Sequence, residues 1–159
     1  MGNGKKLVVF YTRSGVTRKV ADEIKKLLSC DIEEIEDQVD RKGVIGFIKS
    51  GAAARKGRST PIAPPKNDAS DYDTVIIGTP VWAGRVSCAV RAYIEANREK
   101  FKNVAFFATM GGSGDSGAFA DMEALCKKSP VAKLTVLSRK VKNLGYEEEL
   151  KKFVGAISS

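Results

Sequence analysis

Three loops of this sequence place threonine and glycine residues directly after an apolar run. They read Thr12-Arg13-Ser14-Gly15-Val16-Thr17, Thr79-Pro80-Val81-Trp82-Ala83-Gly84 and, for the third, Thr109-Met110-Gly111-Gly112. Hydroxyl groups both donate and accept hydrogen bonds, and glycine lets the backbone approach a ligand closely. These loops are therefore the candidates for a ligand-binding site.

The first loop has the composition of a phosphate site. A helical pattern follows it, and the first turn of a helix presents free N–H groups and a partial positive charge to an anion. Thr12, Ser14 and Thr17 add hydroxyl donors, and Gly15 leaves room for the phosphate. The same residues also fit an ordinary turn with a Ser or Thr cap, so the spacing alone leaves both interpretations open.

Several kinds of catalytic site are excluded by composition and spacing. The chain has no histidine, which removes Ser-His and Cys-His pairs and histidine metal sites. Its three cysteines, Cys30, Cys88 and Cys126, show neither a metal spacing nor a disulfide framework. Residues 112–117 spell G-x-G-x-x-G but follow the fourth strand pattern, which makes them weak evidence for a dinucleotide site. We expect no metal site, and cysteines that are core residues.

Short apolar runs separated by turn residues predict a parallel sheet. Residues 30–36 alternate acidic residues with Ile32 and Ile35, as in an edge strand with one wet face. Helical patterns lie between the strands, and the alternation predicts a doubly wound α/β fold with helices on both faces of the sheet. The runs typical of strands buried on both faces are residues 5–11, 74–78, 104–108 and 132–137.

Length and charge add further expectations. The 159 residues fit one domain, residues 1–159. No stretch approaches the roughly 18 apolar residues of a membrane span, so we expect no integral membrane association. The scattered cysteines, without a disulfide framework, indicate a reducing cytosol, so we expect a cytoplasmic protein. The net charge is +8, and residues 41–66 hold seven bases and no acid around a weakly predicted helix near residues 44–55. That segment fits an acidic partner or a solvated face, and no aromatic-interleaved basic stripe indicates nucleic acid.

The three loops resemble those of the flavodoxin family. Residues 12–17 are similar to its T/S-x-T/S-G-x-T phosphate loop, and residues 72–84, YDTVIIGTPVWAG, are similar to its Y-D-x-v-i-i-G-x-P-v-W-x-g segment. Residues 109–114 resemble the third, Gly-rich flavin loop. The resemblance covers nearly the whole chain. It implies a five-stranded parallel sheet in the order 2-1-3-4-5, with FMN at the first three carboxyl-end loops, as in the short-chain branch.

The resemblance also implies a role for each loop. The first would hold the FMN phosphate, the second would line the isoalloxazine with Trp82 as its nearest aromatic, and the backbone of the third would face the pyrimidine edge. The alternative for Trp82 is a role in helix packing. Charges at Arg13 and Arg85 would favour reduction of the flavin. The implied cofactor-binding residues are Thr12, Arg13, Ser14, Gly15, Val16, Thr17, Thr79, Pro80, Val81, Trp82, Ala83, Gly84, Arg85, Thr109, Gly111, Gly112, Ser113, Gly114 and Asp115.

By the same resemblance, the chain would be an FMN protein that moves electrons between redox partners, with the flavin doing the chemistry. The third loop lacks the tyrosine that many family members stack on the flavin, so we expect one open flavin face. This openness favours the alternative of an NAD(P)H:quinone-type oxidoreductase. A flavin-free basic binding module is a second alternative. We expect a redox partner protein, acidic in charge, to dock near residues 41–66.

Overall fold

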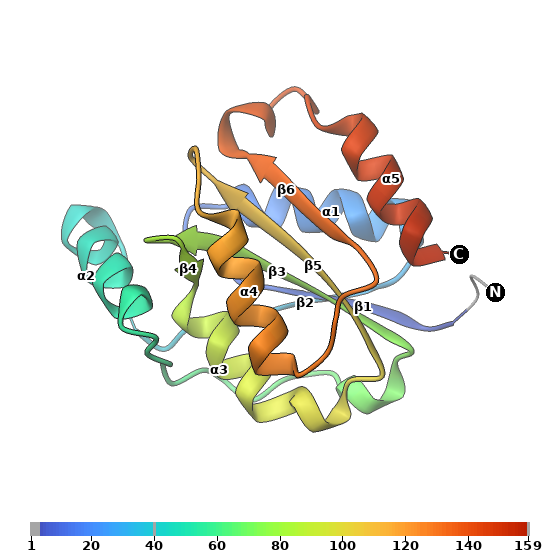
Figure 1. Ribbon diagram of the computed structural model, residues 1–159, viewed down its shortest axis with the longest axis horizontal. Helices are drawn as coiled ribbons and strands as arrows, with labels where there is room; N and C mark the ends of the chain where they lie inside the picture. Colours follow the sequence, from blue (N-terminus) through green and yellow to red (C-terminus); the bar gives the residue numbers. More distant parts are fainter. Residues whose placement is uncertain (1–3, 40, 159) are drawn as a thin grey trace.

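A parallel sheet runs through the centre of the computed structural model, which describes residues 4–39 and 41–158 (Figure 1). Its strands lie in the order β2-β1-β3-β5-β6, and the two-residue strand β4 pairs with β3. Counting the parallel strands alone, this is the predicted order 2-1-3-4-5. The strands are β1 (Lys6–Phe10), β2 (Asp31–Glu34), β3 (Thr74–Trp82), β4 (Arg85–Val86), β5 (Asn103–Met110) and β6 (Lys133–Leu137).

Helices cover both faces of the sheet, as predicted (Figure 1). Helices α1 (Val16–Leu28) and α5 (Glu147–Ser158) pack on one face and on each other. Helices α3 (Cys88–Asn97) and α4 (Asp115–Cys126) pack on the other face. Helix α2 (Gly43–Arg55) lies at the outer edge of the molecule, beside β3, β4 and α3.

The central strands bury side chains on both faces, which explains their uninterrupted apolar sequences. In β1, Leu7 and Val9 belong to the core under α3 and α4, whereas Val8 and Phe10 belong to the core under α1 and α5. With both faces apolar, polar chemistry is confined to the ends of the strands.

Strand β3 extends beyond the predicted residues 74–78. Pro80 still pairs with Thr109 of β5, and Trp82 pairs with Arg85 in an antiparallel hairpin. Residues 79–82, expected in a loop, are therefore strand. The hairpin turn has φ 51° at Ala83 and 73° at Gly84, the pair of positive values that a two-residue turn of type I′ needs.

Edge strand β2 is in its predicted place, but its acidic face is not fully solvated. The Glu33 side chain is buried, and its carboxylate accepts hydrogen bonds from the backbone N–H groups of Lys66 and Asn67 at 2.8 and 2.9 Å. The returning segment around residues 61–67 thus covers this edge, because a bare strand edge would expose unpaired backbone groups.

Gly78 lies in the middle of β3 because a ring from β5 fills the space of a side chain. A Cβ at this position would lie 2.0 Å from Cζ of Phe107. We expect Gly78→Ala to lower the free energy of unfolding by about 1–3 kcal/mol, measured by urea denaturation, because the core must shift to relieve the overlap. As a control, Gly155→Ala on the exposed side of α5, where a Cβ meets no atom within 4 Å, should raise stability by about 1 kcal/mol. Equal stability of Gly78→Ala and the parent protein would contradict this packing.

All four tyrosines, Tyr11, Tyr72, Tyr93 and Tyr146, are buried. Burial is the main cause that raises the pKa of Tyr11, Tyr72 and Tyr146 from 10.0 to about 12, and it also raises the pKa of Tyr93. Because the folded state holds these protons more tightly, it gains stability below pH 10 that is lost as the pH rises towards 12. We expect no tyrosinate absorbance step near pH 10 while the protein is folded. Ionisation of all four tyrosines at pH 10 in the folded protein would contradict these raised pKa values.

Candidate functional site

The carboxyl ends of β1, β3 and β5 bring the three loops together at one edge of the sheet (Figure 1). The first and third loops meet through the hydroxyl groups of Thr17 and Thr109, 2.8 Å apart and buried. The second and third meet backbone to backbone, since a Cβ at Gly114 would lie 2.8 Å from Cα of Gly84. All three segments predicted from sequence are thus neighbours in space.

The first loop leaves the N-terminus of α1 open. Gly15 precedes the helix with φ 94°, and within the described residues no side chain caps this end. The Thr12 hydroxyl instead accepts a hydrogen bond from the Gly15 N–H at 2.9 Å, which fixes the turn before the helix. Ser14 is exposed at the mouth of the loop, and the first helical turn carries no acid. The helix therefore presents N–H groups and the positive end of its dipole to an anion.

Thr17 and Arg13 of this loop also connect it to other segments, which the sequence did not predict. Thr17 is buried, and its hydroxyl ties the loop to Thr109 rather than facing solvent. Arg13 reaches α2: its Nη1 donates to the Arg41 carbonyl at 3.3 Å, and its Cζ lies 5.2 Å from the centre of the Phe47 ring. Arg13 thus connects the phosphate-type loop to the long connection that follows β2.

The second loop is a hairpin whose residues face different ways. Thr79 is fully buried, and its hydroxyl lies 3.0 Å from the Ser87 hydroxyl and accepts the Ser87 N–H at 3.1 Å. It therefore fixes the start of α3. Pro80 and Val81 are half-buried, and Ala83 is exposed at the turn.

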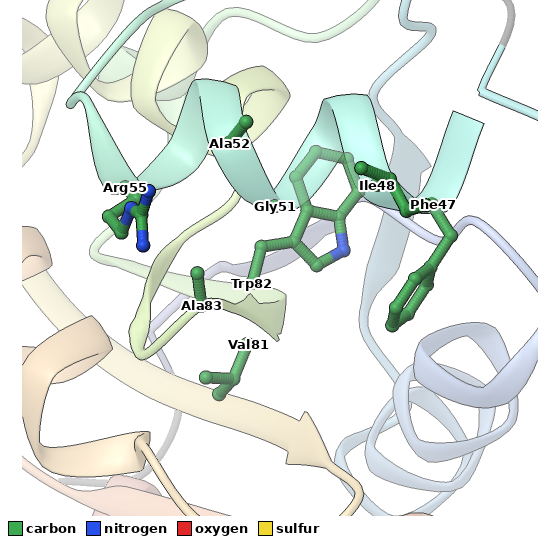
Figure 2. A pocket seen from close by; sticks show the side chains of 8 residues that line it. All are labelled: Phe47, Ile48, Gly51, Ala52, Arg55, Val81, Trp82 and Ala83. Atoms are coloured by element: carbon green, nitrogen blue, oxygen red, sulfur yellow. The ribbon is translucent and has the colours of Figure 1, made fainter. Parts of the chain in front are cut away.

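An apolar cavity of about 410 Å³ lies between this hairpin and α2. Figure 2 shows its lining side chains, with the Trp82 indole against the helix, Phe47 pointing along one side and Arg55 at the opposite end. The mostly apolar lining suits an aromatic group. The lining residues are Val81, Trp82 and Ala83 of the hairpin and Phe47, Ile48, Gly51, Ala52 and Arg55 of α2. Sequence reasoning missed the α2 members, although apolar residues inside a basic segment were a signal.

A buried polar cluster holds Trp82 in position. The Tyr11 ring stands perpendicular to Trp82 with centroids 5.5 Å apart, and Cζ of Arg41 lies 5.3 Å from the centre of the Trp82 ring. Arg41 forms a buried ion pair with Asp37, and its Nη1 donates to Oγ of Ser50 on α2 at 3.3 Å. Both interpretations of Trp82 are therefore compatible with the fold: it packs on a helix, and it also lines the cavity.

Arg85 is turned towards α4. Its Nε and Nη2 donate to the two carboxylate oxygens of Asp121 at 2.8 and 3.0 Å, and its Nη1 donates to the Arg55 carbonyl at 3.1 Å. Arg91 adds a second cation 3.4 Å from the same carboxylate. The Asp121 carboxylate thus offsets part of the combined charge of Arg85 and Arg91, and the influence of Arg85 on flavin reduction stays a prediction.

The third loop offers mainly backbone. Gly111, Gly112 and Ser113 are exposed, whereas the carboxylate of Asp115 accepts a hydrogen bond from Thr135 of β6 at 2.8 Å. Gly114 and Gly117 press against the hairpin, where a Cβ at Gly117 would lie 2.2 Å from the Gly84 carbonyl oxygen. Backbone groups of residues 111–113 are therefore the part of this loop that a ligand can reach.

All three cysteines are wholly or partly buried. Cys88 and Cys126 are buried and Cys30 is half-buried, and all three are free thiols. Burial is the main cause that raises the pKa of Cys30 to about 11 and that of Cys126 to about 12, so the thiolate that redox or metal chemistry needs is disfavoured. Among residues 4–39 and 41–158, no cluster of His, Cys, Asp and Glu could hold a metal ion. In that same part of the chain, no helix is long and apolar enough to cross a membrane.

Known structures share this architecture. A flavoprotein from Lactobacillus acidophilus NCFM in complex with FMN superimposes with a TM-score of 0.76 at 18% identity, covering 94% of this chain and 98% of its own. The apo form of the flavoprotein from the same organism gives 0.62 at 20% identity, covering 87% and 95%. Oxidised Flavodoxin 2 from Bacillus cereus gives 0.59 at 16% identity, covering 97% of each chain. A comparison with curated proteins finds no match.

A family model described as Flavodoxin matches residues 5–157. The match takes in all three loops, the whole sheet and all but the last residue of α5. It agrees with the strand order and with the structural likenesses. The chain therefore belongs to the flavodoxin family.

Proposed function

We propose that this chain binds FMN at the three loops and carries electrons between redox partners. The observation that supports this most strongly is the uncapped N-terminus of α1, which shares one sheet edge with the apolar cavity beside Trp82. A phosphate and a flat aromatic ring are the two chemically different parts of FMN. The FMN complex of the Lactobacillus flavoprotein, which has the same fold, supports the same assignment.

The first loop fits the phosphate. Gly15, with its positive φ, turns the chain so that the backbone of residues 14–17 leads into the helix, and the exposed Ser14 hydroxyl adds a donor. Thr12 and Thr17 would act as positioning residues, because their hydroxyls bond Gly15 and Thr109. The compact turn would enclose a terminal phosphate rather than a diphosphate that continues to an adenylate, which favours FMN over FAD.

The hairpin and α2 fit the ring. The lining of the cavity is mostly apolar or small, and Trp82 is held there by Tyr11 and Arg41. When bound, FMN supplies electron transfer in one-electron or two-electron steps. The chain's own residues bind the phosphate, orient the ring and exclude water from one side of it.

A second candidate function is an NAD(P)H:quinone-type oxidoreductase. It is favoured by the third loop, where the exposed Gly111, Gly112 and Ser113 offer no aromatic cover for a ring. A second planar substrate could then reach the cofactor. Steady-state oxidation of NADPH with a quinone acceptor distinguishes the two functions, because an electron carrier without a substrate site turns over neither. A colourless protein that FMN cannot reconstitute would instead indicate a flavin-free binding module.

Ser14→Asp should weaken FMN about a hundredfold and leave riboflavin, which lacks the phosphate, nearly unaffected. Two like charges about 6 Å apart repel by about 3 kcal/mol at an effective dielectric constant of about 20, which corresponds to that factor. Affinities are measured by quenching of flavin fluorescence. The matched control is Ser129→Asp, the same charge change at an exposed serine beyond the end of α4. Equal losses for both ligands would rule out the first loop as the phosphate site.

Trp82 is the only tryptophan of the chain, so its emission reports on the cavity directly. We expect FMN and riboflavin each to quench Trp82 fluorescence to saturation at one equivalent. Trp82→Leu should weaken both ligands by a similar factor of about tenfold, since aromatic contacts contribute about 0.5–1.5 kcal/mol beyond the buried area. Circular dichroism checks the fold of the variant. Unchanged Trp82 emission at saturating FMN would place the ring elsewhere.

A further inference from the structure

Helix α2 is built with its small side chains inward and its large apolar side chains outward. Gly46, Ser50 and Ala54 are buried against the body of the protein. Ile45 and Ile48 are 70% and 63% exposed on the opposite side. A surface helix normally buries its large apolar residues. The outer side of α2 therefore has the apolar composition of a surface that binds a partner.

Part of this apolar surface is already explained by the candidate site. Phe47 lies beside Arg13 and lines the cavity, and Ile48 also contributes to its wall. Ile45 does neither: it is an exposed residue in the first turn of α2. Helix α2 itself lies at the outer edge of the structure (Figure 1). A ligand in the cavity would therefore leave Ile45 uncovered.

Exposed cations lie on α2 and directly after it. Lys49 lies on α2 itself, and Lys56 and Arg58 directly follow it, all exposed. No acid occurs among residues 41–66. Nearby carboxylates are engaged by other bases: Asp37 pairs with Arg41, and Asp121 pairs with Arg85. We refer to Ile45, Ile48, Lys49, Lys56 and Arg58 as the α2 surface.

The charge of the α2 surface selects among the possible occupants. A second copy of this chain in a two-fold contact would bring two identical sets of bases together, which is unfavourable. A partner protein would need a groove for a convex helix as well as an acidic surface. An anionic bilayer meets both requirements at once, because its headgroup region yields to apolar side chains while its phosphates attract Lys and Arg.

We propose that the α2 surface docks the protein on an anionic lipid bilayer, with Ile45 and Ile48 entering the headgroup region and the three bases contacting lipid phosphates. The helix lies along the membrane and does not cross it. Because α2 forms one wall of the cavity beside Trp82, this orientation places the cavity close to the membrane.

The test is sedimentation of the full chain with vesicles of phosphatidylcholine, with and without phosphatidylglycerol. We expect binding only to the vesicles that contain phosphatidylglycerol, and weaker binding as salt is raised. Lys49→Glu combined with Lys56→Glu and Arg58→Glu should lower the affinity by about a hundredfold or more, given the contribution of each base near an anionic surface. Ile45→Ser should lower it by about tenfold.

Matched controls separate the α2 surface from overall charge and hydrophobicity. Lys102→Glu combined with Lys142→Glu and Lys152→Glu changes the net charge by the same amount at exposed positions on other elements. Leu27→Ser removes a 48% exposed apolar side chain from α1. Both controls should bind vesicles like the parent protein.

Three outcomes would overturn the proposal: no binding to anionic vesicles, equal binding to neutral ones, or equal losses in the α2 variants and their controls. The proposal would also be overturned if the protein did not bind anionic vesicles and instead bound an acidic protein. The α2 surface would then be assigned to that partner. Flavin binding is measured separately, so failure here leaves the FMN proposal intact.

Discussion

The arrangement around the cavity depends on one buried side chain, Arg41. Its guanidinium pairs with Asp37 just after β2, bonds Ser50 of α2 and lies over the Trp82 ring of the hairpin. Its backbone carbonyl accepts a hydrogen bond from Arg13 of the first loop. One residue thus holds four segments together: the first loop, the turn after β2, α2 and the hairpin. A buried charge that loses its partner costs about 3–5 kcal/mol, so these four segments keep a single relative arrangement.

This dependence explains how a weak helix former becomes α2. Its two interior glycines, Gly46 and Gly51, oppose a helix by about 1 kcal/mol each relative to alanine. Small residues nevertheless let the helix approach the Arg41 backbone: a Cβ at Gly46 would lie 2.4 Å from the Arg41 carbonyl. Tertiary contact, rather than helix propensity, therefore fixes the position of α2, and the large residues that remain have only the cavity and the outer surface to occupy.

The sheet and the three loops were predictable because their signals are local. Strands buried on both faces have apolar runs whatever packs on them, and a threonine followed by glycine marks the strand ends. The directions of individual side chains were not predictable. The Thr79 hydroxyl, for example, fixes the start of α3 by bonding Ser87, and no short motif predicts the hairpin that brings the two residues together. The ion pair of Arg85 with Asp121 was likewise not predictable, because the two residues lie 36 positions apart in the sequence.

The contact between the second and third loops has a consequence for how this protein can diversify. Gly84 meets Gly114 and Gly117 through backbone atoms, and the Val81 side chain lies against the same contact. Such a contact leaves no room for a side chain at Gly114 or Gly117. Gly112 and Ser113 are exposed and lie outside it, so they can be exchanged in evolution or by design to change what the site accepts, while the two loops stay at the same separation. The glycines therefore keep the distance between the two loops constant, and the exposed positions beside them can vary.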